Sequence, residues 1–314
     1  SREGCNAIIK TKDNSLIVGC GATKIPSSVR CIDKYAFMGC LVEELAIPDG
    51  VERINFFAFS SCPNLKKIVI PASVETIEEL AFDNCPEVIS IVVDKNNTDY
   101  DSRNGCDAII YTSDNKLILG CSSTIIPQDI ETISAFAFSH CRNLQRIVVP
   151  EGVSCIAAGA FEYCSSLKEV ILPTTLESFI GGSNFGYCTS LESITIPKGV
   201  CHMENDIFRG CISLQKISVD SANETFDSRN NCNAVIDTEQ NKLVAGCKGT
   251  VIVDGIKSIG SRAFYKSGIT SVHIPSSVEL IEPAAFKGCE YCMSIWVEES
   301  NKTYKSAGSN SVVE

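Results

Sequence analysis

Apolar residues recur along this chain in a unit of about 23 residues. The unit reads Ile-Pro-x-x-Val-x-x-Ile-x-x-x-Ala-Phe-x-x-Cys-x-x-Leu-x-x-Ile-x, and its phenylalanine marks nine copies. Neighbouring copies are 22–24 residues apart, except at two intervals of 56 residues. The nine phenylalanines are Phe37, Phe59, Phe82, Phe138, Phe161, Phe185, Phe208, Phe264 and Phe286. A period of this length is typical of solenoids, in which each coil buries its apolar face against neighbouring coils.

Each unit contains two short extended segments and a turn. In the segment 65–70, Leu65, Ile68 and Ile70 have the spacing of inward side chains on a strand, and Pro71 ends the strand because it cannot donate a hydrogen bond. A second extended piece covers 74–77, and we expect a helical or 3₁₀ turn around Ala81 and Phe82 to carry the chain back. The pattern therefore predicts a β-rich α/β solenoid of about nine units.

A second repeat occupies the two long intervals. Segments 101–121 and 227–247 share one sequence pattern, which recurs in truncated form at 1–20. Each copy has two apolar runs joined by a polar Thr-x-x-Asn, a pattern typical of a β-hairpin. We expect one solenoid over 1–314, with hairpin inserts at about 1–20, 101–121 and 227–247 and repeats at about 25–93, 126–219 and 252–297.

The repeat unit resembles a known family. The form Ile-Pro-x-Ser-Val-x-x-Ile-x-x-x-Ala-Phe-x-x-Cys, seen at 70–85 and 274–289, resembles the BspA-like leucine-rich-repeat family of bacterial surface and secreted proteins. The hairpin sequence at 5–9 is similar to inserts in members from gut Bacteroidetes. The resemblance covers essentially the whole chain. It implies an extracytoplasmic protein, at the cell surface or secreted, and some members are implicated in adhesion to host proteins or other cells.

Composition and charge narrow the range of partners. Hydrophobic residues make up 44% of the chain and charged residues 21%, which is typical of a folded protein. The net charge of −11 argues against nucleic acid and against anionic membrane surfaces, because both are bound by clustered Lys and Arg. No apolar run approaches the roughly 20 residues that a transmembrane helix needs. For a member of a family with adhesive proteins, the expected ligand is a protein or a glycan.

The 18 cysteines fall into two main groups. Eight share one column after the Ala-Phe turn, where we expect small, buried, reduced side chains; they are Cys40, Cys62, Cys85, Cys141, Cys164, Cys188, Cys211 and Cys289. If the hairpin turns centre on Lys12 and Asp13 and their equivalents, three pairs of hairpin cysteines face each other within disulfide range, namely Cys5–Cys20, Cys106–Cys121 and Cys232–Cys247. If Asn14 instead adopts a left-handed conformation and forms a bulge, the register slips and the facing is lost.

The remaining chemistry is sparse. Cys289 and Cys292 spell Cys-x-x-Cys, but Cys289 is the repeat cysteine, Cys292 fills a repeat leucine column, and no second pair exists to complete a zinc site. The three histidines have no His-Glu-x-x-His partner, and no glycine loop could cradle a phosphate. We therefore predict a protein that is not an enzyme, without catalytic residues, metal or cofactor.

The outward column of the main strand is the candidate ligand-binding surface. Its members include Val69, Val92, Val148, Ile171, His273 and Trp296, the last being the single tryptophan of the chain. Exposed apolar residues in a row can mark a partner site, although β propensity or burial of Trp296 under other parts of the protein would explain them as well. The sequence favours a surface binding or adhesion module. The alternative is a structural spacer within a larger surface protein.

Overall fold

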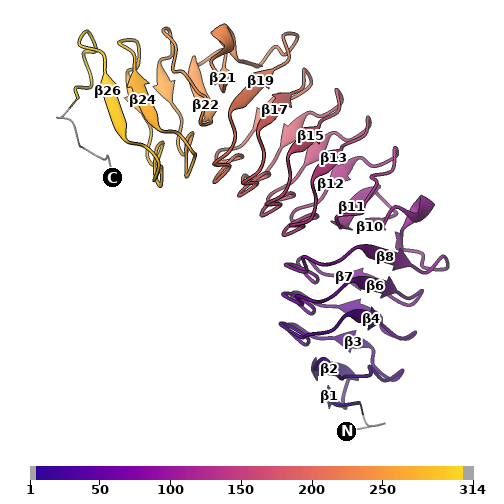
Figure 1. The fold of residues 1–314 in the computed structure, drawn as a ribbon. Helices are drawn as coiled ribbons and strands as arrows, with labels where there is room; N and C mark the ends of the chain where they lie inside the picture. The colour runs from indigo at the N-terminus through magenta and orange to yellow at the C-terminus, as the bar shows by residue number, and fades with distance from the viewer. Residues whose placement is uncertain (1–4, 307–314) are drawn as a thin grey trace. The chain divides into compact units, whose positions relative to one another are not determined.

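The computed structural model describes residues 5–306, which fall into two compact units that divide between Leu144 and Gln145. Both units are β-solenoids of short strands stacked coil upon coil (Figure 1). The described residues form about 12 turns and contain no α-helix. The expectation of one uninterrupted solenoid over the whole chain stays a prediction.

The first unit carries its strands in three sheets. The main strands form a parallel sheet with the order β4 (Glu44–Ala46), β6 (Lys67–Ile70) and β8 (Ser90–Val93). The shorter second strands follow the first hairpin in the order β1 (Ile8–Lys10), β2 (Ser15–Val18), β3 (Cys31–Ile32), β5 (Arg53–Ile54) and β7 (Thr76–Ile77). Next come β9 (Tyr100–Asp101), the one-turn 3₁₀ helix η2 (Arg103–Gly105), the hairpin β10 (Ala108–Tyr111) and β11 (Lys116–Gly120), and β12 (Thr132–Ile133).

The second unit repeats this plan. Its main strands pair in parallel as β13 (Arg146–Val148) with β15 (Glu169–Ile171), β17 (Ser193–Ile196) with β19 (Lys216–Val219), and β24 (Ser271–Ile274) with β26 (Ser294–Val297). The second strands are β14 (Cys155–Ile156), β16 (Ser178–Phe179) and β18 (His202–Met203). A further sheet holds β20 (Phe226–Asp227), the hairpin β21 (Ala234–Asp237) and β22 (Lys242–Gly246), β23 (Ser258–Ile259) and β25 (Leu280–Ile281), with η3 (Arg229–Asn231) beside it.

The repeat phenylalanines form ladders inside each unit. Phe59 is fully buried and stacks on Phe37 and Phe82, with ring centroids 5.0 and 5.3 Å apart. In the second unit, Phe161 and Phe185 stack at 5.4 Å. In the first unit, the inward strand residues and the stacked rings of Phe37, Phe59 and Phe82 belong to one core cluster, as the repeat pattern predicts. A further cluster in the second unit covers buried residues from Cys232 to Ala285.

The turn after the second strand is not helical, which corrects the expected α/β solenoid to a β-solenoid. Around Ala81 and Phe82, Leu80 and Asn84 have φ values of 59° and 53°, in the left-handed region that interrupts a right-handed helix. Alternate amides of the turn in the preceding coil donate to this turn instead: Phe59 N donates to Ala81 O at 2.8 Å, and Ser61 N donates to Asp83 O at 2.8 Å. Hydrogen bonds between coils thus replace those within a helix.

The cysteine column lies beside the ladder of repeat phenylalanines and bonds its backbone carbonyls. The thiol of Cys62 donates to Phe37 O at 3.3 Å, and the thiol of Cys188 donates to Phe161 O at 3.1 Å. Cys211 donates in the same way to Phe185 O at 3.0 Å. A small apolar side chain with one weak donor fits this position because the carbonyl of the preceding coil is buried with it.

The hairpin disulfides are not formed in the structure. All six hairpin cysteines lie within the described residues 5–306 and are free thiols. They are Cys5, Cys20, Cys106, Cys121, Cys232 and Cys247. Near the turn, Tyr111 pairs with Lys116, which is the register that would bring Cys106 opposite Cys121. A bulge then shifts the register by one residue, so that Ala108 pairs with Gly120. Asn14, Asn115 and Asn241 are left-handed, with φ of 53°, 48° and 50°, in accordance with the second alternative.

Each complete insert begins with an asparagine that clamps the preceding coil. Asn97 Nδ2 donates to Pro71 O at 2.8 Å and to Val74 O at 2.9 Å, while its Oδ1 accepts from Tyr100 N at 2.8 Å. Asn223 and Asn301 make the equivalent bonds. This side chain satisfies backbone groups where the regular coil is interrupted.

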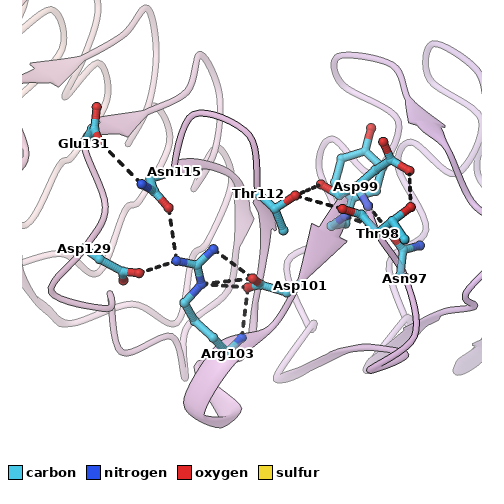
Figure 2. A network of polar contacts seen from close by, with 10 residues as sticks. Asn97, Thr98, Asp99, Asp101, Arg103, Thr112, Asn115, Asp129 and Glu131 are labelled. Atoms are coloured by element: carbon cyan, nitrogen blue, oxygen red, sulfur yellow. Dashed lines mark hydrogen bonds and ion pairs between the residues drawn. The ribbon is translucent and has the colours of Figure 1, made fainter.

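An arginine network holds the insert of the first unit (Figure 2). Arg103 Nε donates to both carboxylate oxygens of Asp101 at 3.0 Å, and its Nη1 donates to Asn115 Oδ1 at 3.1 Å and to Asp129. Arg229 repeats the contacts with Asp227 and Asn241 in the second unit. The guanidinium fork thereby joins the start of the insert to its hairpin turn.

Candidate functional site

The candidate column lies on the outward side of the main strands in both units. In the first unit, Val69 of β6 pairs in register with Val92 of β8, and their inward neighbours Ile68 and Ile70 are buried. Val69 is half-buried, whereas Val92 is 43% exposed. The alternation along each strand thus places these two valines on the solvent side.

In the second unit the same column changes its chemistry from coil to coil. Val148 and Ile171 pair in register and are 42% and 41% exposed. Further along the unit, Thr195 and Ser218 pair, and their hydroxyls lie 2.9 Å apart. The column is therefore aliphatic on β13 and β15 and polar on β17 and β19.

The column ends in an aromatic pair. His273 of β24 and Trp296 of β26 are register partners, and their rings stack with centroids 4.2 Å apart at an interplanar angle of 17°. Both side chains are exposed, Trp296 by 54%. The six predicted residues thus form three cross-strand pairs, and these lie on three separate sheets.

Polar side chains flank the column. On β13 and β15, Arg146 Nε and Glu169 Oε2 form an exposed ion pair at 2.8 Å. Lys67 occupies the corresponding flanking position on β6 and is exposed. On β6, β13 and β15, the aliphatic positions of the column thus lie beside solvated charged side chains.

Sequence comparison identifies the family. The profile of the BspA type leucine rich repeat region matches residues 19–106, 117–235 and 245–311, in six copies. This chain belongs to the BspA-type leucine-rich-repeat family. The six matched copies do not confirm the count of nine repeats. No curated protein sequence matches the chain.

Solved structures share the BspA-type fold. A leucine rich cell surface protein from Faecalibacterium prausnitzii is 22% identical, with a TM-score of 0.55, over 94% of this chain and 75% of its own. A leucine-rich repeat protein from Eubacterium ventriosum is 22% identical, with a TM-score of 0.61, over 87% of this chain and 80% of its own. The pneumococcal vaccine antigen PcpA is 19% identical, with a TM-score of 0.54, over 87% of this chain and 72% of its own. At these identities the likeness concerns the fold alone.

The second compact unit of this BspA-type chain contains a ladder of tyrosine rings and cationic side chains that was not predicted from the sequence. Tyr163 and Tyr187 stack at 4.7 Å, and the Arg209 guanidinium lies 5.1 Å from the Tyr187 ring and 5.0 Å from the Tyr265 ring. Lys266 Nζ donates to the Tyr187 hydroxyl at 2.9 Å. Burial favours a raised pKa for Tyr187, but the nearby Lys266 and Arg209 lower it overall. The 24-residue interval between the two stacked tyrosines was the available signal.

This ladder joins two coils that the second insert separates in sequence. Gly210 N donates to Tyr265 O at 3.4 Å, and Arg262 forms an ion pair with Asp206 at 3.5 Å. Because Arg209 lies over both rings, its planar faces are already in contact with aromatic side chains. We therefore interpret the ladder as a structural clamp.

The described residues hold no evident chemical centre. Within 5–306, no cluster of three or more His, Cys, Asp or Glu could hold a metal ion. The thiols of Cys289 and Cys292 donate to different carbonyls, those of Phe264 and Ser294. Across the same residues, no helix has the length and apolar character to cross a membrane.

Proposed function

We propose that this BspA-type chain is an extracytoplasmic, non-enzymatic binding module that holds a protein or glycan on its main-strand face. The observation that carries the proposal is the exposed, stacked pair of His273 and Trp296. Tryptophan in a site that a partner can desolvate contributes strongly to binding, and here a neighbouring ring already holds it in place.

The aliphatic pairs extend this surface. Val148 and Ile171 continue the outward column within the same unit, and Val69 and Val92 have the same place in the first unit. A partner that covers such positions gains from burying apolar area without displacing a charge. The cell-surface description of the Faecalibacterium prausnitzii structure supports an extracytoplasmic location.

Binding of the purified chain to arrays of extracellular-matrix proteins and glycans tests the proposal. The test variant combines Trp296→Ala with Ile171→Ser. Its matched control combines Tyr291→Ala with Val251→Ser, which removes one aromatic and one aliphatic side chain that are 50% and 59% exposed outside the main strands. We expect a ligand that binds the control and the unchanged chain but binds the test variant at least about tenfold more weakly.

Two results would contradict the proposal. Binding that the test variant retains would place the ligand away from the strand face. No ligand on either array would favour the spacer function, in which the solenoid holds other parts of a surface protein at a distance.

A further inference from the structure

The cross-strand pairs between the first two strands of the complete inserts include one that differs between the two units. In the first unit, Tyr100 of β9 pairs with Tyr111 of β10, and their ring centroids lie 5.5 Å apart. The Tyr100 hydroxyl accepts a hydrogen bond from Ile77 N, on the edge strand β7, at 2.9 Å. In the second unit, the corresponding pair is Phe226 and Asp237. The second unit therefore lacks the Tyr100 hydroxyl and the whole phenol group of Tyr111.

The hydroxyl recurs near the end of the chain. Tyr304 accepts from Ile281 N at 2.9 Å, as Tyr100 does from Ile77 N. The equivalent amide in the second unit belongs to Met203, on the edge strand β18. Phe226 has no oxygen to offer it. The N–H of Met203 thus lacks the tyrosine oxygen that the equivalent amides of Ile77 and Ile281 bond.

A cleft of about 210 Å³ lies at this position. It is lined by Met203, Phe226 and Asp237, together with Asn205 and Gln240. We call it the insert cleft. Because a water needs about 10–15 Å³ of such volume, the insert cleft has room for a ligand of monosaccharide size.

The basic side chains that line the insert cleft have acidic partners. Lys242 Nζ forms an ion pair with Glu282 at 2.7 Å, and His202 lies 3.3 Å from Glu204. Asp237 Oδ1 accepts from Gln240 N at 2.8 Å, which leaves Oδ2 to accept from a ligand. This lining suits a neutral ligand better than an anion, because no cation is left without an acidic partner.

We infer that the insert cleft binds a sugar residue through its hydroxyl groups. One hydroxyl takes the place of the missing tyrosine oxygen and accepts from Met203 N. Others donate to Asp237 and exchange hydrogen bonds with the amide side chains of Asn205 and Gln240. A hydroxyl both donates and accepts, so adjacent hydroxyls satisfy this mixture of groups. The strands that form the insert cleft are not those that carry the outward column, so this inference does not depend on the proposed function.

The test uses the full 314-residue chain. Saturation-transfer NMR with millimolar D-glucose, D-galactose, D-mannose, L-fucose and N-acetyl-D-glucosamine detects binding of each sugar. The variant Phe226→Tyr/Asp237→Tyr introduces the tyrosine pair of the first unit and should fold, because that pair already exists at Tyr100 and Tyr111. We expect transfer to at least one sugar, with affinity lowered at least about tenfold in this variant.

Further variants locate the site. Asp237→Asn, which preserves shape, should weaken the same sugar because the carboxylate acceptor becomes an amide. Trp296→Ala should leave its binding unchanged, which separates the insert cleft from the strand face. Three results would overturn the inference: no transfer to any of the five sugars, equal affinity in the tyrosine-pair variant, or a panel of neutral amino acids that binds as well as the sugars do.

Discussion

Gly120 lies directly against the ring of Phe138, and an added Cβ at this glycine would stand 2.2 Å from Phe138 Cε1. Gly19 with Phe37 and Gly246 with Phe264 have the same relationship at the other hairpins. Gly120 and Gly246 end the second strand of their hairpins, and Gly19 directly follows β2. None of these hairpins contributes a repeat phenylalanine of its own to the ladder. The ring of the following repeat packs onto the bare backbone instead.

Replacing Gly120 by alanine should therefore destabilise the fold. The methyl group cannot fit without moving a fully buried ring, and overpacking of this kind costs about 1–3 kcal/mol. Urea unfolding followed by circular dichroism measures the loss. The control is Gly21→Ala, whose Cβ would come no closer than 3.4 Å to another atom, and a change within about 0.5 kcal/mol is expected there. Equal losses in the two variants would refute the packing argument.

Asn97→Ala should be more costly than its exposed neighbour Asn96→Ala. Asn97 is 9% exposed and bonds two carbonyls and the amides of Asp99 and Tyr100, so its loss leaves backbone groups without partners. We expect roughly 3 kcal/mol for Asn97 and less than about 0.5 kcal/mol for Asn96. Thermal melts compare the two variants. Similar melting temperatures would argue against a stabilising role for the Asn97 hydrogen bonds.

Cys20 should be alkylated first in the native protein. It is exposed, and the hydrogen bond from Thr23 lowers its thiol pKa. Burial raises the pKa of Cys106 to about 11 and that of Cys211 to about 12, so few thiolates form there at neutral pH. Brief iodoacetamide treatment at pH 7.5, followed by peptide mass spectrometry, ranks the sites. Labelling of Cys211 before Cys20 would contradict the buried ladder, and a urea-denatured sample shows that every site can react.

Stability should fall as the pH rises above about 8.5, the usual pKa of a cysteine thiol. In the unfolded chain the thiols then lose their protons, whereas burial keeps Cys106 and Cys211 protonated up to about pH 11 and 12. The folded state therefore binds more protons in this window, and the free energy of unfolding decreases with pH.

Melting temperatures from pH 7 to 10.5 under reducing conditions measure this effect. The double variant Cys106→Ala/Cys211→Ala removes two of the thiols and should have a shallower pH dependence than the unchanged chain. An identical pH dependence in the two proteins would mean that other groups, such as tyrosines, cause the loss of stability at alkaline pH.

Much of the architecture could be predicted because it depends on short-range periodicity. The spacing of Leu65, Ile68 and Ile70 indicated which residues of a coil are buried, and the structure buries all three. The same alternation predicted that Val92 and Trp296 are exposed on the outer face. What the column binds is not encoded in this way, because burial constrains the inward residues and leaves the outward ones free to vary.

Contacts between coils decided the rest. The turn at Phe82 is left-handed and pairs with its neighbours rather than forming a helix, because its amide partners lie one repeat away in sequence. A bulge in each hairpin separated the cysteines that the turn alone would have aligned. The insert cleft exists because Phe226 and Asp237 replace Tyr100 and Tyr111, and only the paired strands show that these substitutions occur side by side. The sequence by itself determined the period and the buried face, since both follow from residues close together in the chain. The tertiary structure decided the turn, the thiols and the cleft, since these depend on residues that meet only after the coils stack.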